Sequence, residues 1–82
     1  MPMDWLAKRF AKFLEEVCKR KPEYKKKVST MLKAVKIGDY TLATSLALEL
    51  LEEVNFDEDI PEELRGQAGD LFLNLFLNLL PL

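Results

Sequence analysis

Histidine is missing from this chain of 82 residues, and cysteine occurs only once, as Cys18. These shortages exclude an intramolecular disulfide, a zinc site of the Cys/His type and any nucleophile that depends on a histidine base. Glycine occurs three times and forms no phosphate-binding loop. We therefore predict a protein that is not an enzyme, holds no cofactor or metal, and takes no small-molecule substrate.

Long apolar runs are also missing. The most apolar stretch, residues 71–82, has about twelve residues, whereas a membrane-spanning helix needs about 20, so we expect no membrane association. The first five residues have neither the basic nor the apolar region of a signal peptide. Together with the single cysteine, this favours a cytoplasmic protein. Nine lysines and nine glutamates beside one glutamine are typical of a thermophilic source.

Each half of the chain is poor in charge of one sign. Residues 1–40 carry eleven Lys and Arg against five acids, a net charge of +6. Residues 41–82 carry one base, Arg65, against nine acids, a net charge of −8. This asymmetry indicates either that the halves pair internally or that a basic face is offered to an acidic partner.

One apolar pattern is abundant and occurs four times. Apolar residues recur at i, i+4, i+7, i+8 and i+11 from positions 6, 24, 43 and 64, the spacing of a buried helix face. The last segment has leucine at alternate positions, which also suits a strand. Leucine is a strong helix former, however, and Asp70, Asn74 and Asn78 align only on a helix. The predicted helices span residues 4–20, 22–37, 39–54 and 60–80.

The joints between these helices are short, so consecutive helices are expected to run antiparallel. We predict an all-α fold with one domain, 1–82: a four-helix protein made of two antiparallel helical hairpins, 4–37 and 39–80. Gly38 is expected to end the second helix in a left-handed conformation, and Asp39 to cap the third. The predicted core is Phe10, Phe13, Leu14, Val28, Leu32, Ala47, Leu51, Val54, Leu71 and Leu75.

The last helix has more apolar surface than one buried face requires. One arc faces the predicted core, and a second arc lies beside it. Either this helix is central and wrapped by the other three, or its second arc meets another chain. Three helices with one narrow stripe each are too few to wrap it, so we favour a homodimer, or a heteromer. The second arc, and thus the predicted protein interface, is Gly66, Gly69, Leu73, Phe76, Leu77 and Leu80.

A basic run at the first joint is the most conspicuous surface feature. Its six cations are of the kind that contacts phosphates. The other interpretation is a solvated helix junction, partly paired with the acidic half of the chain. The net charge of −2 argues against direct nucleic-acid binding. The candidate nucleic-acid-binding residues are Lys19, Arg20, Lys21, Lys25, Lys26 and Lys27.

Two turns resemble those of helical repeat families. Gly38-Asp39-Tyr40, followed by Ala43, is similar to the inter-helix turn of tetratricopeptide repeats. The segment that begins at Pro61-Glu62 is similar to a helix start of armadillo and HEAT repeats. The layout also resembles a small archaeal all-helical family. These resemblances imply a binding scaffold without catalytic residues.

The sequence thus predicts a small, non-catalytic helical module or accessory subunit for protein–protein interaction. It is expected to self-associate, or to bind a partner, through the apolar faces of its last helix. The alternative is a nucleic-acid-associated accessory protein that uses the basic segment 19–27.

Overall fold

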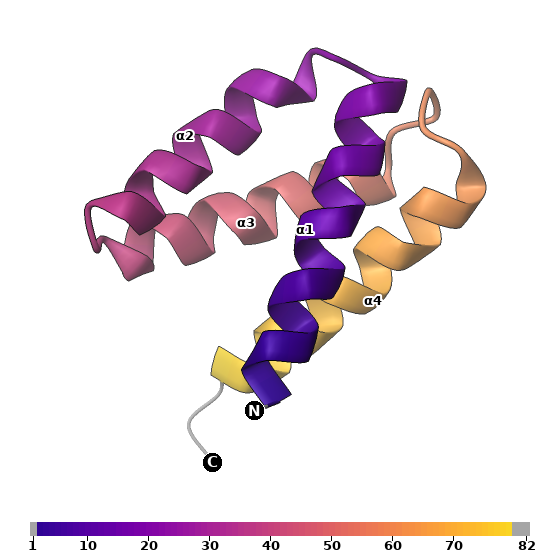
Figure 1. Ribbon diagram of the computed structural model, residues 1–82. Coiled ribbons are helices and arrows are strands. Elements are labelled where there is room, and N and C mark those ends of the chain that lie inside the picture. The colour runs from indigo at the N-terminus through magenta and orange to yellow at the C-terminus, as the bar shows by residue number, and fades with distance from the viewer. Residues whose placement is uncertain (1, 80–82) are drawn as a thin grey trace.

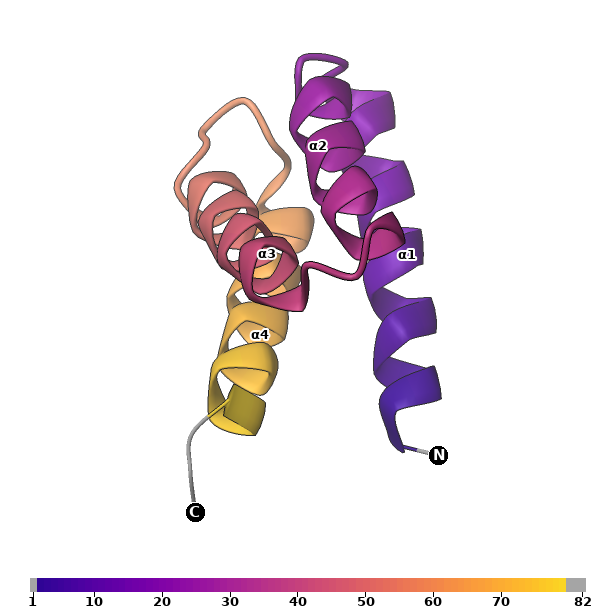
Figure 2. The same cartoon turned by 90° about the vertical axis from the view of Figure 1, so that its left-hand side faces the viewer.

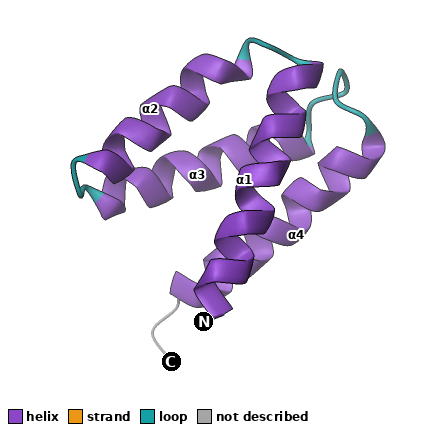
Figure 3. Ribbon diagram, viewed as in Figure 1, coloured by secondary structure: helices purple, strands orange, loops and turns teal. Residues whose placement is uncertain are grey.

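The computed structural model describes residues 2–79, with side chains for residues 7–78, and this part of the chain is all-α (Figure 3). Its four helices are α1 (Pro2–Arg20), α2 (Tyr24–Lys36), α3 (Tyr40–Asn55) and α4 (Glu62–Leu79). Their bounds lie within two residues of the predicted ones in the described range, which confirms the all-α, four-helix prediction.

Consecutive helices run in opposite directions and form two layers (Figures 1 and 2). α1 and α2 form one layer, and α3 and α4 form the other. α3 packs closely on both α4 and α2, whereas α1 contacts α2 and α4 less extensively. Away from their connecting turn α1 and α2 diverge (Figure 1), and α2 packs more extensively on α3 than on α1.

The core lies between the two layers and takes side chains from all four helices. Phe10, Val28 and Leu75 are partly buried against it. The loop between α3 and α4 adds Ile60, which is 1% exposed and is not among the predicted core residues. The predicted core residues that are buried are Phe13, Leu14, Ala47, Leu51, Val54 and Leu71.

The prediction that Leu32 belongs to the core is wrong, because its side chain is 53% exposed. α2 instead buries Met31 and Ala34. α3 in turn buries the small side chains Ala43 and Ala47, and alanines on both helices permit a close approach. Leu32 follows Met31 by about 100° around the helix axis, so its side chain points away from the contact between α2 and α3.

The turn between α2 and α3 has the predicted chemistry. Gly38 has a φ of 81°, in the left-handed region that residues with a Cβ avoid. Its N–H bonds the Val35 carbonyl at 3.0 Å, which helps to close the end of α2. The Asp39 carboxylate then accepts the N–H of Leu42 at 3.1 Å and caps α3.

Candidate functional site

One side of α4 is left exposed by the described part of the chain. Leu73 and Leu77 are each 58% exposed, and Phe76 is 44% exposed. These residues belong to the predicted interface, whose last member, Leu80, lies outside the described residues. We name this surface the outer face of α4 and define its described part as Gly66, Gly69, Leu73, Phe76 and Leu77.

The opposite side of α4 forms part of the core, as predicted. Leu64, Ala68 and Leu71 are all buried, and α3 and α1 are the helices packed against α4. The alternative in which α4 is wrapped on every side is therefore wrong for the described residues. The helix with close neighbours on two sides is α3, because it packs on both α2 and α4.

The two glycines of the outer face have different surroundings. A Cβ at Gly69 would come within 3.1 Å of Asn55 Nδ2. That amide donates to the Arg65 carbonyl at 2.9 Å, so Gly69 makes room for a bond that ties α3 to α4. Among the described residues, nothing lies within 4 Å of a Cβ at Gly66, so no neighbour in that part of the chain requires a glycine there. A glycine inside a helix lowers its stability by about 1 kcal/mol relative to alanine.

A groove of about 450 Å³ borders the outer face, where the end of α3 meets α4. Phe56, Gly69 and Leu73 are among its lining residues, and the Phe56 side chain is 76% exposed. Phe72 also lines this groove, and its ring stacks on that of Phe76, with centroids 6.1 Å apart and planes 9° apart. Aromatic side chains are enriched at protein interfaces, so Phe56 extends the apolar surface from α4 to the end of α3.

Charge is nearly absent from this part of α4. Between Gly66 and Asn78 the only ionisable side chain is that of Asp70. The Asn74 and Asn78 amides each donate to the backbone carbonyl four residues earlier, at 2.9 and 2.8 Å. Two copies of this surface can therefore meet with little electrostatic repulsion.

The predicted basic patch is partly neutralised where the first joint meets the loop between α3 and α4. Lys21 Nζ donates to Asp57 Oδ2 at 2.8 Å and to Asp59 Oδ2 at 3.1 Å. The Tyr24 hydroxyl donates to the same Asp57 oxygen at 2.6 Å. This cluster joins residues more than 30 positions apart and holds the loop against the start of α2.

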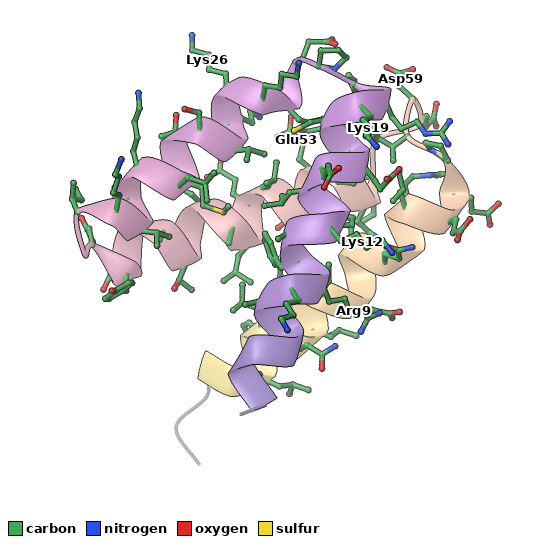
Figure 4. The ribbon with its side chains drawn as sticks, viewed as in Figure 1. Arg9, Lys12, Lys19, Lys26, Glu53 and Asp59 are labelled. Carbon is green, nitrogen blue, oxygen red and sulfur yellow. The ribbon has the colours of Figure 1, made fainter. Side chains whose placement is uncertain are left out.

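Two further cations of the basic run are also paired. Lys19 pairs with Glu15 and Glu16 on its own helix, and Lys27 pairs with Glu53 of α3. Lys26, by contrast, points away from the body of the protein (Figure 4). The candidate nucleic-acid-binding residues for which the described structure gives no ion pair are Arg20, Lys25 and Lys26.

The cluster around Asp57 shifts the proton affinity of its members. The hydrogen bonds from Lys21 and from Tyr24 lower the pKa of Asp57 to about 2. Burial and the hydrogen bond to Asp57 raise the pKa of Tyr24. The hydrogen bonds to Asp57 and Asp59 raise the pKa of Lys21. Folding therefore favours the ionised form of Asp57, which ties stability to pH.

Asp57→Asn is expected to lower the free energy of unfolding by about 1–2 kcal/mol at pH 7. The pKa of Asp57 is about 2 in the folded chain and ordinarily 3.8. The negative charge of Asp57 therefore stabilises the folded chain fully above pH 3.8. This stabilisation is lost as the pH falls toward the folded pKa of about 2. Urea unfolding at a series of pH values measures the difference, with Glu58→Gln as the exposed control. A loss in Asp57→Asn that is equally large at pH 7 and below the folded pKa would contradict the argument.

Within residues 7–78, no group of three or more Cys, Asp or Glu side chains is placed to bind a metal ion. None of the helices, as far as they are described, combines the length and apolarity that a membrane span requires. No family model, curated protein or solved structure matches the chain. The resemblance of its turns to helical repeats therefore stays a prediction.

Proposed function

We propose that this protein is a small, non-catalytic helical interaction module that self-associates through the outer face of α4. The observation that carries the proposal is the exposure of Leu73, Phe76 and Leu77 side by side on one helix. Scattered single apolar residues are normal on a protein surface, whereas adjacent ones on one face are typical of an interface. Burying them against another chain removes apolar area from water and so stabilises an assembly.

The proposed partner is a second copy of the chain. A surface with a strong charge of one sign would repel its own copy, but Asp70 is the only charge between Gly66 and Asn78. In a twofold dimer the same patch serves both subunits. Gly66, which has open space around it, lets the backbone of a second helix approach closely there.

The second candidate function, association with nucleic acid, has less support. Within the basic run, Lys19, Lys21 and Lys27 are held in ion pairs with acidic side chains of the same chain. The remaining cations act against a net charge of −2. We therefore propose a protein partner for this module.

Crosslinking locates the contact. In a Cys18→Ser background, Leu73, Phe76 and Leu77 are changed to cysteine one at a time and treated with a short bismaleimide. At least one of these variants should form a covalent dimer in high yield, because a twofold axis brings equivalent residues together. Ile37→Cys and Leu42→Cys serve as controls, since both positions are exposed and lie outside α4. Equal crosslinking from the controls, or none from α4, would overturn the proposed function.

A further inference from the structure

α2 carries a strong positive charge on its exposed side. Between Tyr24 and Lys36 it has five lysines and no acidic residue. In the described part of the chain, Lys27 is the one of these that forms an ion pair, with Glu53 of α3. The lysines of α2 that are exposed and, in the described structure, without an ion pair are Lys25, Lys26, Lys33 and Lys36.

Apolar side chains lie among these lysines. Lys25, Leu32 and Lys36 are spaced i, i+7 and i+11, which places them along one line of the helix. Next to them is a shallow groove of about 360 Å³ beside α1, with Cys18, Val28 and Leu32 as its apolar floor. Burial raises the pKa of the Cys18 thiol, which therefore stays neutral at pH 7. We name this surface the α2 groove; its lining includes Cys18, Lys25, Val28, Leu32, Lys33 and Lys36.

We propose that the α2 groove binds an acidic amphipathic helix of a partner protein. Such a helix lays an apolar side chain over Leu32 and directs carboxylates toward Lys25 and Lys36. Eleven positions separate the two lysines, a rise of about 16 Å along the helix axis. About three turns of the partner helix therefore match the groove.

Charge complementarity and the apolar floor together select this partner. A nucleic acid would bind the lysines through its phosphates but would gain nothing from Leu32. The outer face of α4 complements the groove poorly, because it offers Asp70 between Gly66 and Asn78 and Glu52 in its bordering groove against the four lysines of α2. The α2 groove and the outer face of α4 are therefore separate sites, and each can be lost without the other.

A designed peptide tests the proposal. The probe has about 18 residues, or about five helical turns, with leucines on one face and glutamates on the other. One control peptide has lysine in place of each glutamate, and a second has serine in place of each leucine. Fluorescence anisotropy with the full-length protein should show saturable binding of the probe with a Kd below about 100 µM. Both control peptides should bind at least about tenfold more weakly.

Variants of the protein separate charge from apolar contact. Lys25→Glu/Lys36→Glu and Leu32→Ser should each weaken probe binding at least about tenfold. Lys8→Glu/Lys12→Glu has the same change of charge on α1 and should stay within about twofold of the unchanged protein. Circular dichroism checks that each variant is folded, as expected for substitutions at exposed positions.

Three results would overturn the proposal. The first is no saturable binding of the probe. The second is tight binding of a DNA duplex that depends on Lys25 and Lys36 but not on Leu32, which would assign the groove to nucleic acid. The third is salt-sensitive self-association that Lys25→Glu/Lys36→Glu abolishes, which would make a second copy the occupant.

Discussion

Leu73→Glu/Leu77→Glu is expected to convert the proposed α4-linked dimer into a folded monomer. Both leucines are 58% exposed in the single chain, so the glutamates have free access to water in the monomer. In the proposed dimer the same substitutions place four carboxylates at the contact, to which residues 66–78 supply no lysine or arginine. The dissociation constant should therefore rise by roughly 100-fold or more.

Sedimentation equilibrium measures this change, and thermal unfolding followed by circular dichroism shows that the variant is folded. Ile37→Glu/Leu42→Glu is the matched control, because these apolar residues are also exposed but lie outside α4. The control should keep the mass of the unchanged protein. An α4 variant that keeps the dimer mass would place the contact elsewhere.

Leu51→Ala is expected to lower the free energy of unfolding by about 2–5 kcal/mol. The Leu51 side chain is fully buried in α3, the helix that packs on both α2 and α4. The substitution removes apolar contacts and leaves a cavity that the surrounding helices fill only in part. The total free energy of unfolding of a domain of this size is small, so this loss should lower the midpoint of unfolding measurably.

Leu42→Ala makes the same chemical change on the same helix at a position that is 44% exposed. This substitution should lower the free energy of unfolding by less than about 1 kcal/mol. It removes less buried apolar surface than Leu51→Ala and leaves no closed cavity. Urea unfolding of the two variants at equal chain concentration gives the comparison. Equal losses from both positions would contradict the assignment of Leu51 to the core.

The four helices could be predicted from the sequence because their spacing and end residues are local properties. The apolar pattern gave the helix bounds to within two residues over the described range, and Gly38 and Asp39 marked one turn in detail. Leu32 shows where this reasoning fails. Its position fits an apolar stripe, but α2 buries Met31 and Ala34 instead, and Leu32, about 100° further around the helix than Met31, faces solvent.

The exposed apolar side chains of α4 could be predicted because this helix contains more apolar residues than one buried stripe needs, and their role as an interface stays a prediction. The cluster of Lys21, Tyr24 and Asp57 could not be placed, because it joins the first joint to the third across more than 30 residues. The opposite charges of the two chain halves indicated such pairing without specifying its members. Gly69 was assigned to an interface, and its contact with Asn55 appears only once α3 and α4 are packed together.

The solution mass of the unchanged protein as a function of concentration tests the central claim most directly. Sedimentation equilibrium at micromolar chain concentrations should give about twice the 9.5 kDa of one chain. On dilution the mass should fall toward that of a single chain, as for a reversible dimer. A mass of one chain at every concentration would contradict the proposal that the outer face of α4 binds a second copy.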